Sequence, residues 1–306
     1  MKPTMTTKEE IQQWFLQLQD SICQHLEVAD GLGKFIRDPW ERPGGGGGIS
    51  GILTGGHVIE KGGVNFSAVW GPTPEPVLKS LSLNTGTGSE FFATGVSIVI
   101  HPVNPMVPIM HMNVRYFEMS GSNAGWWFGG GIDLTPHYVD PDDAAYFHRR
   151  LKAICDLHHP SYYHEFSKWA DDYFYIKHRQ ETRGIGGIFF DYLRGDNEFT
   201  KESRFEFVRS VGLAFAPLYV HFMKKNHPLP YGENEKLWQS IRRGRYVEFN
   251  LVWDRGTRFG LDTEGRTESI LMSLPPNARW LYNHIPAKGS AEEHTQRLLR
   301  KNMDWL

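Results

Sequence analysis

The spacing of hydrophobic residues near the start of the chain predicts a helix. Its apolar residues recur every three or four positions and would share one helical face: Ile11, Phe15, Leu18, Ile22 and Leu26. Thr7 and Glu10 have the spacing of a capping box, which marks a helix start, and Gly31 and Gly33 supply an end signal. Residues 1–9 are expected to form a disordered tail.

The rest of the chain alternates between blocks of strand-like and helix-like pattern. Strands are expected within residues 49–70, 92–134, 187–190, 245–254 and 268–274. Helices are expected within residues 141–182, 201–225, 233–242 and 290–300. Because the blocks lack a regular βαβ alternation, the pattern favours a single α+β domain spanning residues 1–306, with a large, mainly antiparallel sheet covered by helices.

A run of glycines, Gly44 to Gly48, follows Pro43. It is not a P-loop, because no Lys-Ser or Lys-Thr pair follows at the required offset. We expect a flexible loop over residues 44–48. Two interpretations stay open for it, a lid that approaches a ligand closely and a mobile surface loop.

Two of the expected strands, 96–101 and 111–117, carry polar residues at alternating positions. Successive side chains of a strand point to opposite faces, so alternate residues share a surface. If the two strands lie side by side, one surface would collect Ser97, His101, His111, Asn113 and Arg115. A polar face usually contacts water, but these residue types also orient ligands.

The expected strand at 245–254 has the cleanest alternation. One face would be apolar and consist of Val247, Phe249, Leu251 and Trp253. The other would carry Tyr246, Glu248, Asn250, Val252 and Asp254. This face is capable of hydrogen bonding without being rich in Lys and Glu, so a ligand-binding role competes with simple solvation.

Trp126, Trp127 and Phe128 stand directly before three glycines and Asp133. Flat aromatic surface therefore lies beside uncovered backbone. A core plug followed by a turn and a planar-ligand site with Asp133 as its polar anchor explain the segment equally well.

Composition narrows the function classes. With 40% hydrophobic and 22% charged residues in 306, the chain is not disordered. The formal net charge of −2 gives no basic excess for nucleic acid. Two cysteines, Cys23 and Cys155, are too few for a disulfide framework and favour a cytoplasmic protein. Neither a secretory signal nor a membrane-spanning apolar stretch is recognisable.

Fourteen histidines raise the question of a metal site. No HExxH pair and no Cys/His ligand spacing is present, so structural or acid–base roles are favoured over a tight metal site. No GxSxG elbow is present either, which argues against a covalent nucleophile.

Several longer motifs carry a resemblance to one known family. They are HPVNP at 101–105, HMNVRYF at 111–117, WWFGGGIDLTP at 126–136, YFYIKHR at 173–179, RGIGGIFFD at 183–191, RGRYVEFNLVWDRGT at 243–257 and ESILMSLP at 268–275. In this order they resemble the oxygen-dependent coproporphyrinogen III oxidases of the bacterial, soluble type. The resemblance runs from about residue 10 to Trp305.

The resemblance implies a function in haem synthesis. Coproporphyrinogen III would be converted to protoporphyrinogen IX by oxidative decarboxylation of the ring A and B propionates to vinyl groups. Molecular oxygen would be the co-substrate, no organic cofactor would be involved, and carbon dioxide and hydrogen peroxide would be released. The family fold is a large antiparallel sheet with helices on both faces, in a cytoplasmic homodimer whose contacts would map to roughly residues 246–281.

The resemblance also implies roles for particular residues. The proton donor would be His111. Substrate contacts would come from Ser97, Asn113, Val114, Arg115, Glu264, Gly265 and Arg266. Metal ligation would fall on His101, His111, His148 and His178. Whether a divalent metal such as manganese is needed is not settled by the resemblance.

Substrate chemistry extends this set. Propionates need guanidinium partners, for which Arg115, Arg255 and Arg266 are the candidates. The pyrrole N–H groups need an acceptor such as Asp254 or Asp133, so the expected catalytic set is His111, Asp254, Arg255 and Asp133. Trp126, Trp127 and Phe128 would form an apolar wall that excludes water. A tetrapyrrole-binding protein without catalysis and a His-ligated metal oxidoreductase are the alternatives.

Overall fold

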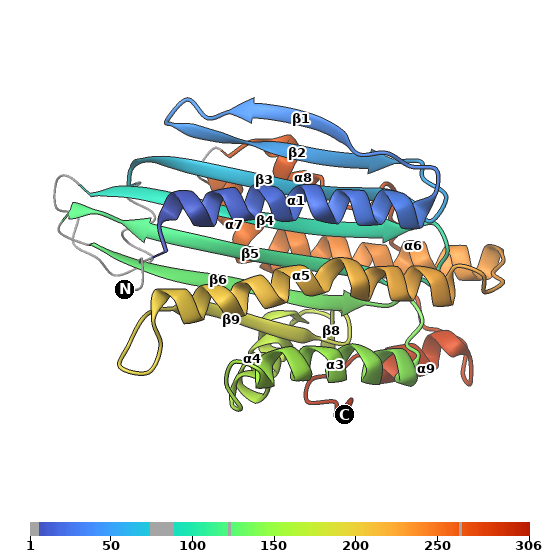
Figure 1. Cartoon of the computed structure of the whole chain (residues 1–306). Helices are drawn as coiled ribbons and strands as arrows, with labels where there is room; N and C mark the ends of the chain where they lie inside the picture. Colours follow the sequence, from blue (N-terminus) through green and yellow to red (C-terminus); the bar gives the residue numbers. More distant parts are fainter. Residues whose placement is uncertain (1–5, 74–88, 122–123, 263–264) are drawn as a thin grey trace.

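A computed structural model describes residues 6–73, 89–121, 124–262 and 265–306. Within these ranges seven strands form one sheet in the order β1-β2-β3-β4-β5-β6-β9, and every neighbouring pair is antiparallel (Figure 1). The strands are β1 (Ile36–Glu41), β2 (Gly46–Thr54), β3 (Ile59–Pro72), β4 (Glu90–Pro102), β5 (Ile109–Met119), β6 (Gly125–Thr135) and β9 (Gly187–Leu193). The antiparallel α+β architecture expected from the sequence is confirmed.

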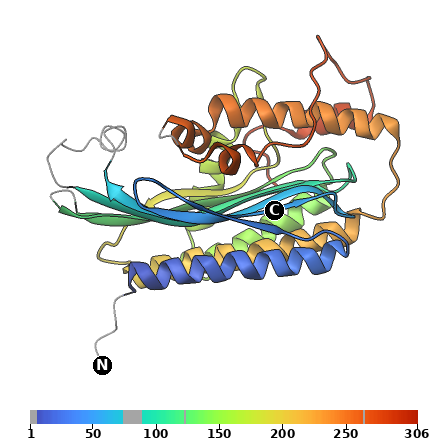
Figure 2. The same ribbon diagram turned by 90° about the horizontal axis from the view of Figure 1, so that it is seen from above.

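Helices cover both faces of this sheet. The helical elements are α1 (Lys8–Asp30), α3 (Pro141–Asp156), α4 (Tyr162–Tyr173), α5 (Lys201–Asn226), α6 (Glu233–Glu248), the π-helix η2 (Phe249–Trp253), α7 (Arg255–Asp262), α8 (Thr267–Leu271) and α9 (Ala291–Leu298). The sheet separates α1 and α5 from α6, as Figure 2 shows. The helical region expected at 141–182 is confirmed for α3 and α4 but is wrong at its end, where β7 (Tyr175–Ile176) and β8 (Glu181–Thr182) form a small antiparallel hairpin.

The first helix forms as its sequence signals predict. Thr7 and Glu10 make both bonds of the capping box, and Gly31 ends α1 in the left-handed conformation with φ 77°. Its apolar face is buried against the sheet and α5. Because the capped helix begins at Lys8, the expected disordered tail is wrong for residues 8–9; residues 1–5 lie outside the described ranges.

The alternation of β4 and β5 divides the sheet into two chemically different faces. Val96, Ile98 and Val114 are fully buried in the main core, on the side that α1 and α5 cover. The register pairs Ser97 with Asn113. The opposite face, beneath α6 to α8, therefore carries the polar residues, as the sequence predicts (Figure 2).

The expected strand at 245–254 is wrong, because these residues continue α6 and then form η2. Burial follows a helical spacing through Trp238, Ile241, Tyr246 and Phe249, whereas Leu251 is 45% exposed. The two faces expected for a strand do not exist. The strand expected at 268–274 is also wrong, because its first four residues belong to α8. Tertiary packing overrides a period-two pattern that is coincidental here.

The expected flexible loop at 44–48 is wrong for Gly46 to Gly48, which pair with β3 as part of β2. A Cβ atom at Gly47 would lie 2.2 Å from the Trp40 carbonyl oxygen, and one at Gly48 would lie 2.3 Å from that of Phe66. Neighbouring backbone, rather than a ligand or a lid, requires these glycines.

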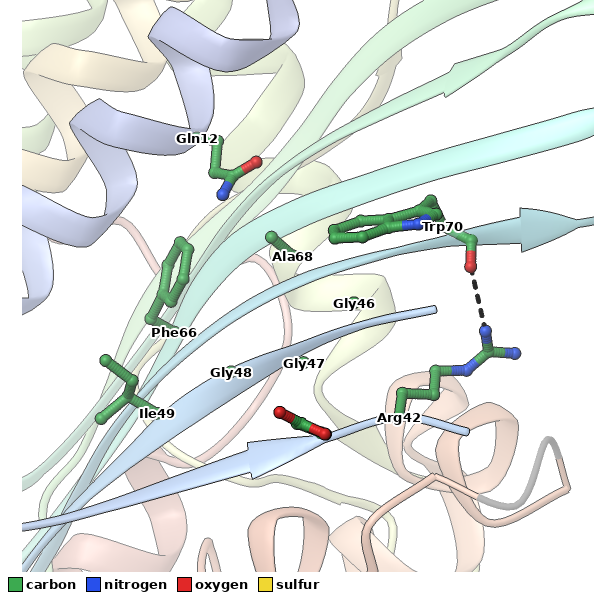
Figure 3. A pocket seen from close by; sticks show the side chains of 10 residues that line it. Gln12, Arg42, Gly46, Gly47, Gly48, Ile49, Phe66, Ala68 and Trp70 are labelled. Carbon is green, nitrogen blue, oxygen red and sulfur yellow. Dashed lines mark hydrogen bonds between the residues drawn. The ribbon is translucent and has the colours of Figure 1, made fainter. Parts of the chain in front are cut away.

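An open hollow of about 540 Å³ lies beside this glycine segment (Figure 3). Gln12, Phe66, Ala68 and Trp70 line it, and Arg42 donates a hydrogen bond to the Trp70 carbonyl at 3.2 Å. Phe66 and Ala68 belong to the main core, so the hollow lies on the α1 side of the sheet. It is therefore separate from the polar face.

In the ranges that the structure describes, no helix combines the length and the apolar character needed to cross a lipid bilayer.

Candidate functional site

The polar face of the sheet is centred on an aligned pair of residues from neighbouring strands. His111 of β5 lies opposite Asp133 of β6, and its Nδ1 is 2.7 Å from Asp133 Oδ1. A carboxylate only accepts, so Nδ1 carries the hydrogen and Nε2 is the nitrogen available for proton exchange. The His111 side chain is 20% exposed and that of Asp133 2%. The pair therefore joins a buried anion to an accessible imidazole.

Asp133 is held from the other side by Arg183, a residue that sequence reasoning missed. Arg183 Nη2 lies 2.8 Å from each Asp133 oxygen, and Nη1 donates to Asn250 Oδ1 at 2.9 Å. The guanidinium carbon lies 4.4 Å from the ring centre of Phe174, and two further rings lie at 4.7 Å. Burial acts to raise the pKa of Asp133, but Arg183 and His111 outweigh it and lower that pKa. Asp133 is thus ionised and committed to these partners.

Arg115 of β5 places a further guanidinium on the same face of the sheet. Its Nη2 lies 2.7 Å from Asp191 Oδ2, and Nη1 donates to Asn113 Oδ1 at 2.8 Å. Ser97 lies directly across from Asn113, so both join this face. The Val114 side chain is fully buried on the opposite face, which leaves only its backbone for a ligand here.

Asp254 stands at the start of α7 and is held by three donors. The Tyr173 hydroxyl donates to Oδ1 at 2.8 Å, while the Thr257 amide and hydroxyl donate to Oδ2 at 2.7 and 2.8 Å. Burial and the neighbouring Asp254 carboxylate raise the pKa of Tyr173, so the phenol stays protonated and donates. The exposed Arg255 guanidinium lies 5.7 Å from the Tyr173 ring centre. This places Asp254, Arg255 and Tyr173 together.

Arg266 lies over the other end of the sheet. It donates to Asp38 of β1 at 2.5 Å, and the next helix, α8, contacts β2 and β3 through Ser269. The Gly265 amide donates to the Gly260 carbonyl at 2.8 Å. Glu264, expected beside them, lies outside the described residues. The candidate residues therefore span the face from β1 to β9.

The predicted apolar wall is only partly formed, because strand alternation splits its members. Phe128 packs in the main core and stacks on Phe205 of α5, with Trp126 packed beside it. Trp127 points to the other face, in a small cluster with Phe91 and Met119. A different pair supplies flat aromatic surface near the site: Tyr173 stacks on Phe189 of β9, with ring centres 4.0 Å apart.

The structure does not bring the four candidate metal ligands together. His101 Nε2 bonds to the Ser273 carbonyl at 2.8 Å, and burial lowers the pKa of His101 to about 3. His148 lies on α3, where it bonds to Tyr163 and the Ile185 carbonyl, and burial lowers its pKa to about 4. His178 contacts Glu248.

Across the described ranges, no group of three His, Cys, Asp or Glu side chains is arranged to hold a metal ion. The donors are directed to protein partners instead. The residues do not fit a common ion in this arrangement, and we assign no step to one.

Comparison with known proteins points to one family. The family described as Coproporphyrinogen III oxidase matches residues 10–305. A protein of Drosophila melanogaster named oxygen-dependent coproporphyrinogen-III oxidase is 50% identical over 300 residues, which cover 95% of this chain and 76% of that protein. Proteins of that name from Synechococcus sp. (strain CC9605) and Glycine max, the latter chloroplastic, are 46% and 49% identical. The two alignments cover 99% and 90% of this chain, and 89% and 74% of the respective relatives.

Proposed function

Since the chain belongs to the coproporphyrinogen III oxidase family, we propose that the polar face of its sheet, from His111 to Arg115, is the active site. The chain is an oxygen-dependent oxidase that decarboxylates coproporphyrinogen III in haem synthesis. The observation that carries the assignment is the family match along nearly the whole chain, which includes every strand and helix that forms this face.

The reaction needs no electron carrier when oxygen itself is the acceptor. For each propionic acid side chain, R–CH2–CH2–COOH and O2 give R–CH=CH2, CO2 and H2O2. One hydrogen leaves the β-carbon, the C–COOH bond breaks, and two electrons and two protons reduce oxygen to peroxide. Two such rounds, on rings A and B, give protoporphyrinogen IX. The protein then has to bind, orient and move protons.

We assign carboxylate binding to the arginines that lie over the face. Arg115 is 36% exposed and already pairs with a carboxylate, and Arg255 is exposed beside Tyr173. Arg266 lies toward β1, so three guanidinium groups would contact different edges of one macrocycle. Ser97, Asn113, Gly265 and the Val114 backbone would complete the contacts among the described residues.

Asp254 is the acceptor we assign to the pyrrole N–H groups. Asp133 suits this role less, because both of its oxygens are bonded to Arg183 and the residue is 1% exposed. Loss of an N–H proton to Asp254 would raise the electron density of the pyrrole that gives electrons to oxygen. His111, oriented by Asp133, would donate a proton from Nε2.

A homodimer is part of the proposal. Large apolar side chains are exposed within and just beyond residues 246–281: Leu251, Val252, Phe259, Leu261, Trp280, Leu281, Tyr282 and Ile285. A second copy of the chain would bury them. Size-exclusion chromatography with light scattering tests this directly, and a monomer at micromolar concentration would contradict it.

A cytoplasmic location is also proposed. Cys23 and Cys155 are both buried and free, and burial raises the pKa of each thiol to about 12. Unreactive, unpaired thiols suit a reducing compartment.

The decisive experiment incubates the purified protein with coproporphyrinogen III in air and in an argon glovebox. Chromatography with mass detection is expected to show loss of two carbon dioxides in air, together with hydrogen peroxide, and no conversion under argon. Binding without conversion in air would identify a tetrapyrrole carrier instead. Equal conversion under argon would exclude oxygen as the electron acceptor.

A further inference from the structure

Arg115, the guanidinium assigned above to a substrate propionate, already holds a carboxylate of its own chain. Asp191 Oδ2 lies 2.7 Å from Arg115 Nη2, and the two side chains are 19% and 36% exposed. They come from β9 and β5, which are separated in the sheet by β6. The pair therefore forms above β6, on the polar face.

Gly129 of β6 makes room for this pair. It lies directly across from Arg115 in the β5–β6 register. A Cβ atom at Gly129 would lie 2.4 Å from Asp191 Oδ1 and 2.8 Å from Arg115 Nη2. The ion pair thus rests on bare backbone, and any side chain at 129 would force it apart.

A second local feature fixes the Asp191 carboxylate. The register between β6 and β9 shifts between Phe128 and Gly130, which marks a bulge. Tyr192 in this bulge has φ 52°, a conformation that costs energy for a non-glycine residue. Its amide donates to Asp191 Oδ1 at 2.9 Å. The β-bulge, Gly129 and the Tyr192 amide together hold the Asp191 carboxylate at the Arg115 guanidinium.

We propose that Asp191 is an internal competitor of the substrate carboxylate at Arg115. The proposal rests on the function given above, in which Arg115 binds a propionate. An incoming carboxylate must displace Asp191 or share the guanidinium with it, and either event weakens binding. A ligand with one carboxylate would gain little at this position. A macrocycle that carries four, and that reaches Arg255 and Arg266 as well, would overcome the competition.

Coproporphyrin III, the fully oxidised macrocycle, tests binding separately from turnover, because it keeps all four propionates and is fluorescent. Asp191→Asn keeps the shape and the acceptor for the Tyr192 amide but removes the competing charge. We expect it to bind coproporphyrin III about five- to tenfold more tightly, as for loss of one charge in a partly exposed pair. Asp191→Ser serves as a second variant with the same expected direction.

Asp172→Asn is the matched control. Asp172 is 61% exposed and pairs with Lys301 instead of with Arg115, and this variant loses the same formal charge, so coproporphyrin affinity is expected to stay unchanged. In an Arg115→Ala background, Asp191→Asn is expected to lose its effect, because the group competed for is gone.

The outcomes separate this inference from the proposed function. If Arg115→Ala weakens binding but neither Asp191 variant tightens it, the competitor role is overturned while the Arg115 assignment stands. If Arg115→Ala binds coproporphyrin III as tightly as the unmodified enzyme, the Arg115 assignment fails and the inference fails with it. Tightening by Asp172→Asn equal to that by Asp191→Asn would reduce the effect to net charge and also overturn the inference.

Discussion

Asp133 Oδ1 accepts hydrogen bonds from both His111, at 2.7 Å, and Arg183, at 2.8 Å. One buried oxygen therefore connects the accessible imidazole to a guanidinium that packs against aromatic rings. Arg183 is contributed by the segment before β9, and Asn250, its other partner, by η2. Asp133, which orients His111, is therefore connected through Arg183 to η2, in the helical layer that covers the polar face.

Replacing Arg183 by methionine is expected to lower both stability and turnover. The change leaves the Asp133 carboxylate buried without its guanidinium, which costs ~3–5 kcal/mol of unfolding free energy. Urea unfolding measures the loss of stability, and steady-state kinetics measures the change in kcat and KM. The double variant R183M/D133N, which also removes the buried charge, is expected to recover stability but not kcat, because His111 then hydrogen-bonds to a neutral amide instead of the carboxylate anion.

Arg242→Met is the matched control for this prediction. Arg242 and Glu181 form another buried ion pair, with side chains 3% and 6% exposed, that does not contact His111. This variant is expected to lose stability while keeping kcat near normal. If R183M lost no more kcat than R242M, Arg183 would be a purely structural residue.

Asp254→Ala is expected to lower kcat by ~100-fold or more, the effect of removing a positioned base. Tyr173→Phe removes only the hydroxyl that donates to Asp254 Oδ1 and is expected to lower kcat by ~10-fold with KM little changed. Tyr231→Phe, at an exposed tyrosine just before α6, is the control. Steady-state kinetics with coproporphyrinogen III distinguishes them, and near-normal kcat in D254A would remove Asp254 from the chemistry.

Arg115→Lys tests whether a guanidinium fork is required on the sheet face. Lysine keeps the charge but cannot bind a carboxylate through two parallel hydrogen bonds, so KM is expected to rise by ~10-fold. Arg209→Lys, at an exposed i,i+3 pair with Glu206, is expected to leave KM unchanged. An unchanged KM in R115K would make Arg115 a structural residue held by Asp191.

The polar face could be predicted from the sequence of β4 and β5, because the alternation of polar and apolar residues there has a single physical cause, the burial of one strand face. Ser97 and Asn113 alternate with residues that must be buried beneath α1 and α5, so their common face follows from the strand geometry. The alternation at 246–254 misleads because Tyr246 and Phe249, which are buried, also have helical spacing. Packing against the sheet selects the helix over the strand, and no local signal in the sequence makes this choice.

Arg183 could not be found from the sequence for a related reason. Its partners, Asp133 and Asn250, are separated from it by 50 and 67 residues. The available signal is an arginine within a glycine-rich segment, RGIGG, next to a strand that is almost wholly apolar. A buried arginine needs a carboxylate, but the choice among the acidic residues of the chain depends on the fold.

Removal of bound transition metals is expected to leave turnover intact. The candidate ligands His101, His148 and His178 each bond to a separate protein partner. The protein is dialysed exhaustively against a chelator, and elemental analysis of the dialysed protein confirms metal removal before the aerobic assay. Activity that disappears on dialysis and returns with one added metal would contradict this prediction.

Glu248 is expected to contribute to stability in a pH-dependent way. Burial acts to raise its pKa, but bonds from Arg179, His178 and Trp280, with the charge of Arg245, lower it from 4.5 to about 2. A folded-state pKa below the unfolded one means that the contribution is complete above pH 4.5 and is lost as pH falls toward about 2. Glu248→Gln is therefore expected to be less stable than the unmodified protein at neutral pH. The difference in unfolding free energy should narrow steadily below pH 4.5.

Urea unfolding at a series of pH values measures this difference, with Glu206→Gln as the matched control. Glu206 forms an exposed i,i+3 pair with Arg209, its side chain is 58% exposed, and the corresponding difference is expected to be small and nearly flat with pH. A difference for E248Q that stays constant between neutral and acidic pH would show that Glu248 acts through packing rather than charge. Because Glu248 joins the β7–β8 hairpin to α6 and to Trp280, a difference that narrows in acid would show that the charge of Glu248 stabilises these connections.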